Sequence, residues 1–378
     1  MLSGQTKSLL VAAFSAIILI FSQKAFSQEH GSKIENVSKN AEGQEKKGFD
    51  AKEVIFGHVL DAHEFHFLSY KGSNGKEHEV AIPLPVILYS PQKGFSCFMY
   101  SAFHHGEAEV NGYKLIEGKI EPVEENIKVY DLSLTRNVVQ MLLALTLLVI
   151  LLVNIGKKYS KGQGLTTAPK GFQNAVEPVI TFIRDEVAKP NLGNKYEKYL
   201  PYLLTVFFFI LINNIVGLIP GTANVTGNIA FTAVLGIISF VVITLSGNKH
   251  YWSHIFNPPV PLGIKFIMVP VEVLGIITKP LALVIRLFAN MLAGHIIIIC
   301  LISLIFIFGS ISVGVGWGFS PISIAFSVFI YLIEILVAFI QAFIFANLTA
   351  VFIGQAIEDV HQDHETNHGN GYDDAVII

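Results

Sequence analysis

Positively charged side chains are missing from the C-terminal part of this chain, because residues 287–378 contain no lysine and no arginine. Over the whole sequence only 15% of the residues are charged, whereas 52% are hydrophobic, and the mean hydropathy is +0.55. This composition excludes an ordinary soluble globular protein and is typical of a membrane protein. The net charge of −3 gives no indication of nucleic-acid binding.

Cysteine is also scarce. Cys97 lies in a polar segment and Cys300 in an apolar one, so we expect no disulfide between them. Neither has the spacing of a metal site, and the sequence offers no motif for ATP or a cofactor. We therefore expect no cofactor, no metal ion and no catalytic residue on this chain.

The N-terminus has the pattern of a signal peptide, residues 1–27. Lys7 precedes an apolar run at residues 9–21, which is followed by the small-x-small pattern of residues 25–27. The run is short for a spanning helix, so we expect cleavage and a mature chain that starts outside the cytoplasm. An uncleaved anchor is the alternative, because Lys24 lies just before the expected cleavage site.

A small β-rich extracytoplasmic domain is predicted at residues 51–135, after a polar, flexible leader at residues 28–50. Short β-type runs alternate there with turn signals such as residues 72–75. Three histidines crowd its first strand: His58, His63 and His66. A metal site is one interpretation, but strand alternation puts His63 and His66 on opposite faces, so we favour structural or surface histidines.

Hydrophobic runs dominate the sequence from residue 136 to residue 357. The first, residues 138–155, is followed by three lysines within residues 157–161, which places that end in the cytoplasm. Residues 166–198 have the pattern of an amphipathic interfacial helix followed by a loop. Two more spans are predicted at residues 202–219 and 229–245. The acidic, histidine-rich residues 358–378 predict a disordered cytoplasmic tail, with metal binding as the alternative.

Two hydrophobic segments are too long for a single upright span. Residues 263–309 would form a helix about 70 Å long and residues 321–357 one about 55 Å long, against a hydrocarbon core of about 30 Å. We expect a hairpin of two long, strongly inclined helices with its turn at residues 309–321; helices with a re-entrant break are the alternative. The predicted fold class is an all-α polytopic membrane protein with about five spans and a small β-rich N-terminal domain.

Four charged residues recur every seven positions in the first long segment: Lys265, Glu272, Lys279 and Arg286. This spacing drifts by only about 20° per step around a helix, so all four share one stripe. Asn290 and small residues border Arg286 and would let another helix approach closely. We expect the stripe to meet a partner protein. A stripe that faces another helix of the same chain, with snorkelling lysines, is the alternative.

A second polar track is predicted on the opposite side of this helix. His295 lies about half a turn round from Arg286 and would face the second long helix, which has Glu334 as its acid. An isolated charge in apolar surroundings costs more than a paired one, so we expect His295 and Glu334 to interact. Gln341 extends the track, which suits a path for protons or ions. A buried pair that only fixes helix register is the alternative.

These motifs match a known pattern. The sequence has L-x-L-x-x-R-L-F-A-N-M-x-A-G-H at residues 281–295, Q-A-F-I-F-x-x-L-T at 341–349, N-N-x-x-G-L-I-P at 213–220 and P-x-E at 270–272. Over roughly residues 125–357 the chain resembles subunit a of the F-type ATP synthase membrane sector. The resemblance says nothing about residues 28–135.

The resemblance implies roles for single residues. Arg286 matches the essential arginine that faces the rotating ring of c subunits, and Asn290 matches the asparagine one turn later. His295 and Glu334 match the interacting base and acid, exchanged between the helices relative to some bacterial members. The other matches are Gln341 near the arginine, Glu272 in the opposite half-channel and Asn214, an amide on the second span.

The function implied is that of a proton-conducting stator subunit, in which two offset half-channels couple proton flow to ring rotation and ATP synthesis. The implied partners are the c-subunit ring, the b-subunit peripheral stalk, other synthase subunits and membrane lipids. The expected location is the inner (plasma) membrane, with the C-terminus in the cytoplasm. The alternatives are a secondary transporter with an Arg/His/Glu proton relay and a non-conducting assembly protein. A transporter is expected to show a paired repeat, and none is detectable in the sequence.

Overall fold

The computed structural model describes residues 61–71, 77–106, 108–116, 119–124, 127–160, 171–219, 221–258 and 260–357. The chain divides into two compact units. Unit 1 comprises Met1–Ala168, Phe207–Leu235 and Val284–Phe343, and unit 2 comprises Pro169–Val206, Gly236–Leu283 and Ile344–Ile378. The predicted signal peptide, leader and tail, as well as His58, lie outside the described residues.

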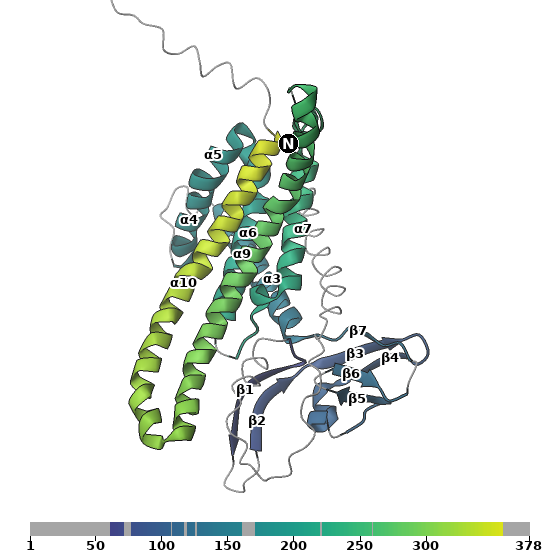
Figure 1. The fold of residues 1–378 in the computed structure, drawn as a ribbon, viewed down its shortest axis with the longest axis vertical. Coiled ribbons are helices and arrows are strands. Elements are labelled where there is room, and N and C mark those ends of the chain that lie inside the picture. The colour runs from purple at the N-terminus through teal and green to yellow at the C-terminus, as the bar shows by residue number, and fades with distance from the viewer. Residues whose placement is uncertain are drawn as a thin grey trace, which may run out of the picture. The chain divides into compact units, whose positions relative to one another are not determined.

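Short antiparallel strands form the first part of unit 1 (Figure 1). They are β1 (Glu64–Lys71), β2 (Glu77–Pro83), β3 (Pro85–Ser90), β4 (Gly94–Met99), β5 (Tyr113–Ile116), β6 (Lys119–Pro122) and β7 (Tyr130–Asp131). The sheets are β1–β2, β4–β3–β7 and β5–β6. The predicted β-rich character is confirmed. The β5–β6 hairpin was not predicted, because strands of 4 residues each are too short to show an alternating pattern.

The central sheet, β4–β3–β7, has one face in the core. Alternation along β3 buries Val86 and Leu88, which pack with Phe103 of the 3-10 helix η1 (Tyr100–Gly106) and with Tyr113 of β5. After β7 the chain continues beside β3, since the N–H of Leu132 donates to the Ile87 carbonyl at 2.9 Å. The central sheet is therefore fastened to the segment that leads into helix α3 (Arg136–Ser160).

Two carboxylates, Asp131 and Asp61, form hydrogen bonds where the central sheet meets the start of α3. Burial opposes ionisation of Asp131, but hydrogen bonds from His63 and Ser133 outweigh it and hold the pKa of Asp131 below its ordinary value. His63 Nε2 lies 3.1 Å from Asp131 Oδ2, and its ring stacks on Tyr100. Asp61 Oδ1 accepts hydrogen bonds from the backbone N–H groups of Ala62 and of Asn137 in the first turn of α3. Burial raises the pKa of the Asp61 carboxyl. His63 is thus a structural histidine, and no three metal-ligating side chains gather among the described residues.

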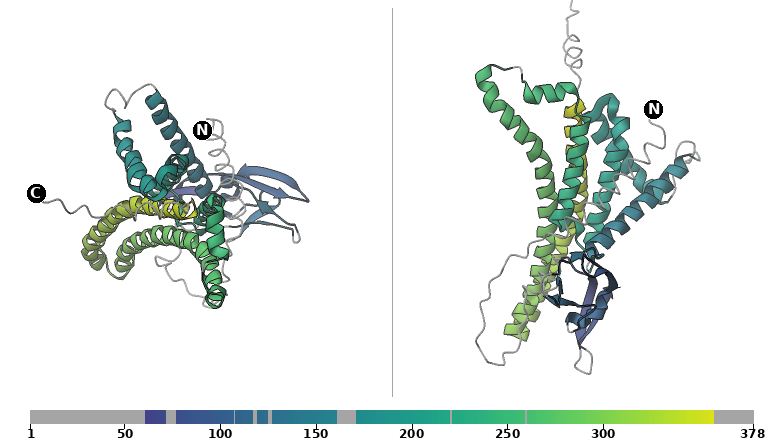
Figure 2. Two further views of the ribbon diagram at one scale, coloured as in Figure 1. Left: turned by 90° about the horizontal axis from the view of Figure 1, so that it is seen from above. Right: turned by 90° about the vertical axis from the view of Figure 1, so that its right-hand side faces the viewer.

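Two long helices, α9 (Leu262–Ile311) and α10 (Val313–Ile357), form a hairpin whose arms run side by side through unit 1 (Figures 1 and 2). Their 50 and 45 residues correspond to about 75 Å and about 68 Å of helix, so both are much longer than a bilayer core. The long hairpin is confirmed, and α9 continues through both of its prolines without a re-entrant break.

The turn lies within the predicted residues 309–321, but it is much shorter than predicted. The helices meet at Ser312, and most of the glycine-rich segment is the first part of α10. An added Cβ on Gly316 would lie only 2.7 Å from the Cα of Gly309. Glycine here allows the two helices to approach closely rather than ending them.

Unit 2 begins with a helical run of changing pitch. It comprises α4 (Phe172–Phe182), the π-helix η2 (Ile183–Ala188), α5 (Lys189–Leu192) and the 3-10 helix η3 (Gly193–Lys195), and then α6 (Tyr196–Gly217) begins. A positive φ of 52° at Gly193 marks the change of direction. The C-terminal part of α10 packs on this run, since Asn191 Nδ2 donates to Asn347 Oδ1 at 3.1 Å.

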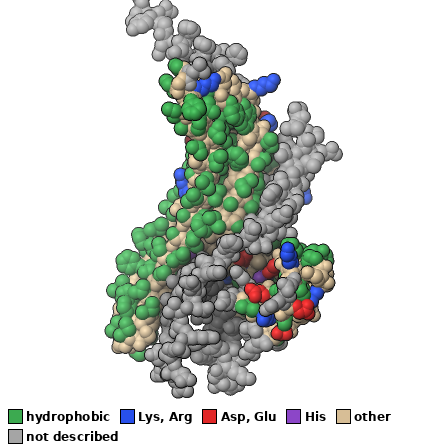
Figure 3. Space-filling model, turned by 45° about the vertical axis from the view of Figure 1, so that its right-hand side comes forward, with side chains coloured by type: hydrophobic (Ala, Val, Ile, Leu, Met, Phe, Trp, Pro, Cys, Tyr) green, Lys and Arg blue, Asp and Glu red, His purple; other side chains and the backbone are tan. Residues whose placement is uncertain are grey.

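The described part of the chain contains 5 helical segments that are long and apolar enough to cross a membrane. They are Arg136–Ser160, Gln173–Gly217, Ile229–Ser246 (α7), Gly263–Ile311 and Val313–Ile357. Hydrophobic side chains cover most of the helical surface visible in Figure 3. The predicted fold class, a polytopic helical membrane protein with a small β-rich part, is confirmed.

Candidate functional site

Arg286 lies on the part of α9 that belongs to unit 1, and its side chain is exposed. Ala289, Asn290 and Ala293 are also exposed, so this face carries small residues around one cation. Leu287 and Met291 are buried and attach the other face of α9 to the protein. Within the described part of the chain, the guanidinium of Arg286 has neither an ion pair nor a hydrogen bond.

Gln341 lies close to Arg286, as predicted, but contacts its backbone. Gln341 Nε2 on α10 donates to the Arg286 carbonyl at 3.2 Å. A carbonyl oxygen has two lone pairs, so the Arg286 carbonyl can accept this hydrogen bond and still accept the one within helix α9. Gln341 therefore fixes the helix that carries the arginine, and the donors of the guanidinium are left for another acceptor.

Glu334 lies on the same buried face of α10 as Ala338 and Gln341. Only 7% of Glu334 is exposed, and its carboxyl packs against Gly294 of α9, where an added Cβ would overlap Oε1. Since His295 is the next residue after Gly294, the structure brings the predicted acid to the part of α9 that carries the predicted base. The absence of a side chain at Gly294 is what leaves room for the carboxyl.

Asn214 joins α6 to α10 within unit 1. It is fully buried, and its Nδ2 donates to the carbonyl of Ala338 at 3.0 Å. Ala338 lies between Glu334 and Gln341, so this bond fixes the part of α10 that carries both polar side chains. Asn290, in contrast, is exposed one turn after Arg286 on the face with the small residues.

Two amides that were not predicted complete the surroundings. Asn224, in the loop between α6 and α7, donates from Nδ2 to the Met291 carbonyl at 3.1 Å and accepts the Gly227 N–H at 2.9 Å. Gln140 of α3 accepts the Ala223 N–H at 2.7 Å. The uncharged loop with its asparagines was the only signal in the sequence, and it did not indicate which helix the loop would contact.

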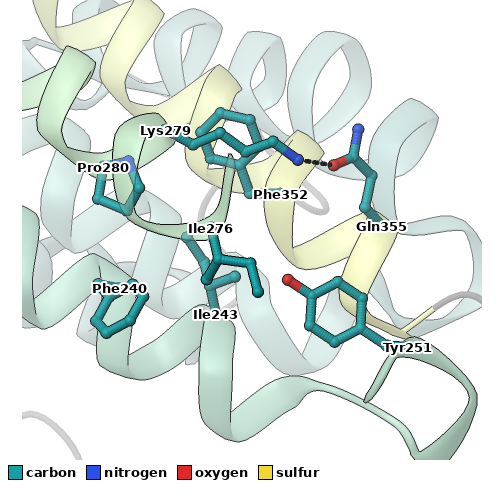
Figure 4. Close-up of a pocket in the computed structure, with 8 residues that line it drawn as sticks. All are labelled: Phe240, Ile243, Tyr251, Ile276, Lys279, Pro280, Phe352 and Gln355. Carbon is teal, nitrogen blue, oxygen red and sulfur yellow. Dashed lines mark hydrogen bonds between the residues drawn. The ribbon is translucent and has the colours of Figure 1, made fainter. Parts of the chain in front are cut away.

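Glu272 and Lys279 belong to unit 2. Lys279 Nζ donates to Gln355 Oε1 at 3.0 Å and lies 5.3 Å from the ring centre of Phe352, beside a small pocket into which Tyr251 of α8 (Lys249–Phe256) also points (Figure 4). Burial and the nearby Glu272 carboxylate raise the pKa of the Tyr251 hydroxyl. Glu272 thus lies near Tyr251, in a part of unit 2 that also contains the Lys279–Gln355 hydrogen bond.

The stripe of four charges is therefore not uniform. Lys279 contacts α10 of the same chain, and Lys265 Nζ donates to Asn257 Oδ1. Both lysines follow the alternative of intramolecular contact, whereas Arg286 presents its charge outward. Seven-residue spacing drifts around a straight helix, which is one reason why residues at the two ends of the stripe meet different surroundings.

This geometry suits ion transfer better than covalent chemistry. A permanently charged guanidinium on an open, small-residue face can attract a carboxylate from a second protein. A buried carboxyl on α10 can gain or lose a proton, and amides nearby can hold water.

Comparison with known proteins adds the family. Residues 138–354 match the model described as ATP synthase A chain, and residues 54–140 match a model described as a domain of unknown function. The chain is 47% identical over 247 residues to "ATP synthase subunit a" of Chloroherpeton thalassium, covering 64% of this chain and 71% of that protein. It is 48% identical over 242 residues to the protein of the same name from Chlorobium phaeobacteroides, covering 62% and 69%. For "ATP synthase subunit a" of Myxococcus xanthus the identity is 41% over 252 residues, covering 65% and 79%.

Proposed function

This chain belongs to the family of ATP synthase A chains, and on that premise we propose that it is the proton-conducting stator subunit of an F-type ATP synthase. The observation that carries the proposal is Arg286, an exposed cation on a small-residue face of α9 whose backbone is tied to Gln341. Such a charge within an apolar span is costly unless a partner offsets it. A carboxylate on a rotating ring of c subunits is that partner.

Arg286 acts on the ring carboxylate by electrostatics. While a ring carboxyl crosses the lipid it is protonated and neutral, because an ionised carboxylate in hydrocarbon is costly. Opposite the guanidinium the ionised form is favoured, so the proton leaves into one half-channel. The guanidinium does not deprotonate in proteins, so it also blocks direct proton passage between the two half-channels. Lysine is a poorer choice, since a buried ammonium loses its proton more readily.

The two half-channels are assigned to different polar groups. His295, Glu334, Asn290 and Gln341 serve the extracytoplasmic half-channel. Asn214 holds α10 in register there through its bond to Ala338. Glu272, near Tyr251, serves the cytoplasmic half-channel. The membrane potential drives the transfer with about 2.3 kcal/mol per charge per 100 mV.

The proposed topology rests on the lysines in the last turn of α3, because positive charge favours the cytoplasmic side of a span. The β-rich residues 51–135 then lie outside the cytoplasm, residues 136–357 form the membrane domain, and the tail is cytoplasmic. The location is the inner membrane. The partners are the c-subunit ring, the b-subunit stalk and the other synthase subunits.

Arg286→Ala tests the proposal in inside-out vesicles that contain the assembled synthase. ATP-driven proton pumping is expected to fall to background while the variant still assembles. Lys249→Ala is a matched control, because it removes an exposed cation from the start of α8. It should pump like the wild type. Undiminished pumping by Arg286→Ala would overturn the proposal.

A further inference from the structure

The outer face of the central sheet is apolar although no part of the described chain buries it. Strand pairing places Tyr89 of β3 opposite both Phe95 of β4 and Tyr130 of β7. The rings form a row, with centroids 4.7 Å apart for Tyr89 and Phe95 and 6.4 Å apart for Tyr89 and Tyr130. Phe95 is 74% exposed and Tyr130 is 52% exposed. We call these three residues the aromatic row.

The rest of this face continues the apolar character. Residues two apart along a strand share a face, so Cys97 and Met99 of β4 lie beside Phe95, and Ile87 of β3 lies beside Tyr89. An antiparallel sheet with one face in the core normally has polar residues on its other face. This sheet departs from that rule, since Val86 and Leu88 already fill the core on its inner face.

The face adjoins the start of a membrane span. The segment after β7 stays hydrogen-bonded to β3, with Leu132 N donating to the Ile87 carbonyl at 2.9 Å and Leu134 N to the Pro85 carbonyl at 3.4 Å. Helix α3 then begins at Arg136, the first residue of a candidate span. The sheet is thus held close to the first residue of a candidate span.

We propose that the outer face of the β4–β3–β7 sheet, centred on the aromatic row, lies in the headgroup region of the bilayer that α3 crosses. Tyrosine and other amphipathic aromatic side chains favour this region, because the ring meets hydrocarbon while the hydroxyl stays hydrated. Lys128, two residues before Tyr130, is exposed and can bind a lipid phosphate as a point charge. Lys93, two residues before Phe95, is paired with Glu124 at 3.3 Å and is not part of this contact. The face is tethered by α3, so its contact with lipid carries little further cost of lost translational freedom.

The chain supplies a reporter for this contact. Cys97 is exposed on the same face and can be labelled with an environment-sensitive nitrobenzoxadiazole probe in a Cys300→Ser chain. The full chain is labelled in detergent, assembled into the synthase complex and reconstituted into liposomes with nitroxide groups on the lipid headgroups. The matched control carries the probe at an Ile82→Cys site in a cysteine-free chain, since Ile82 of β2 is 55% exposed but belongs to another sheet.

We expect the probe at Cys97 to emit at shorter wavelength than the control and to lose about half or more of its fluorescence to headgroup nitroxides, because an interfacial apolar face is buried only about 5–10 Å at the headgroup/acyl boundary. Phe95→Asp should reverse both effects without loss of folding, since Phe95 lies exposed on an edge strand. Quenching by aqueous iodide but not by the lipids would overturn the proposal. So would protection from both quenchers, which would mean that a protein surface, such as another subunit or a second copy, covers the sheet. The measurement on the unsubstituted sheet decides the question even if Phe95→Asp misfolds.

Discussion

Gly294→Ala is the smallest change that should disturb the proposed proton path. The added Cβ would overlap Glu334 Oε1 and lie 2.7 Å from its Cδ and 3.0 Å from its Cγ. Glu334 is 7% exposed, so its carboxyl has little free space into which it can move. The methyl group must therefore displace the carboxyl or separate α9 from α10.

The size of the effect follows from packing. Inserting a methyl group into a filled site typically costs about 1–3 kcal/mol. If this strain falls on the position of the carboxyl during proton transfer, the rate falls about 5-fold to about 150-fold. Folding should not suffer equally, because alanine stabilises a helix interior by about 1 kcal/mol relative to glycine. The expected signature is a fully assembled complex with slow proton flow.

The assay is passive proton conduction through vesicles stripped of the catalytic sector, together with ATP-driven pumping before stripping. Gly275→Ala is the control on the same helix, since an added Cβ there meets nothing within 4 Å. Glu334→Asp in the Gly294→Ala background withdraws the carboxyl by one methylene and should restore part of the conduction. An assembled Gly294→Ala complex that conducts like the wild type would refute the claim that the space at Gly294 positions Glu334.

Three further outcomes are expected. Exchanging the acid and the base, as His295→Glu with Glu334→His, should recover pumping that each single change lowers by more than about tenfold; a double variant no better than either single one would contradict their pairing. Gly354→Ala should lower the yield of folded protein and its unfolding temperature, because the added Cβ would lie 3.2 Å from the Asn191 carbonyl carbon and overlap the carbonyl oxygen. Gly263→Ala is the control in the same thermal-unfolding assay and should be neutral, since an added Cβ there meets nothing within 4 Å. The folded protein lowers the pKa of Asp131 below its ordinary value of 3.8. The resulting stabilisation is therefore complete when the pH is above 3.8, and it is lost as the pH falls through the lowered pKa of the folded state. The difference in unfolding temperature between wild type and Asp131→Asn should shrink only below about pH 4, and a constant difference would contradict this.

Chain length and hydrophobic runs were enough to predict the helical framework. Residues 263–309 and 321–357 exceed the length of an upright span by simple arithmetic, which led to the inclined hairpin. The turn was predicted too long because glycine has two structural uses that look identical in sequence. It can end a helix, or it can let two helices touch, as Gly316 does against Gly309. Only the packing of the second helix separates the two cases.

Charged residues of the candidate site could be predicted because charges are rare in apolar sequence, whereas its amide residues could not, because amides are common. Arg286, His295 and Glu334 are conspicuous because charges are scarce in apolar sequence. Asn224 and Gln140 are ordinary polar residues in the sequence. Their contacts with α9 and with the α6–α7 loop join positions 67 and 83 residues apart, and such tertiary contacts have no local signal. The outward orientation of Arg286 and the inward contact of Lys279 were likewise decided by packing rather than by their shared spacing.

The positions of these amides suit the proposed function, in which α9 presents the Arg286 cation to a moving carboxylate. Gln341 binds the carbonyl of Arg286, and Asn224 binds the carbonyl of Met291. Five residues correspond to about 140° around a helix once whole turns are removed, so the two amides hold α9 from different sides. Neither bond involves the guanidinium, whose five N–H donors stay available to an incoming carboxylate. The proposed rotor, which passes one site after another, would need a stationary charge that binds each carboxylate briefly and releases it. Fixing the backbone instead of the guanidinium meets both needs, because the helix cannot follow the departing carboxylate while the side chain keeps all its donors for the next one.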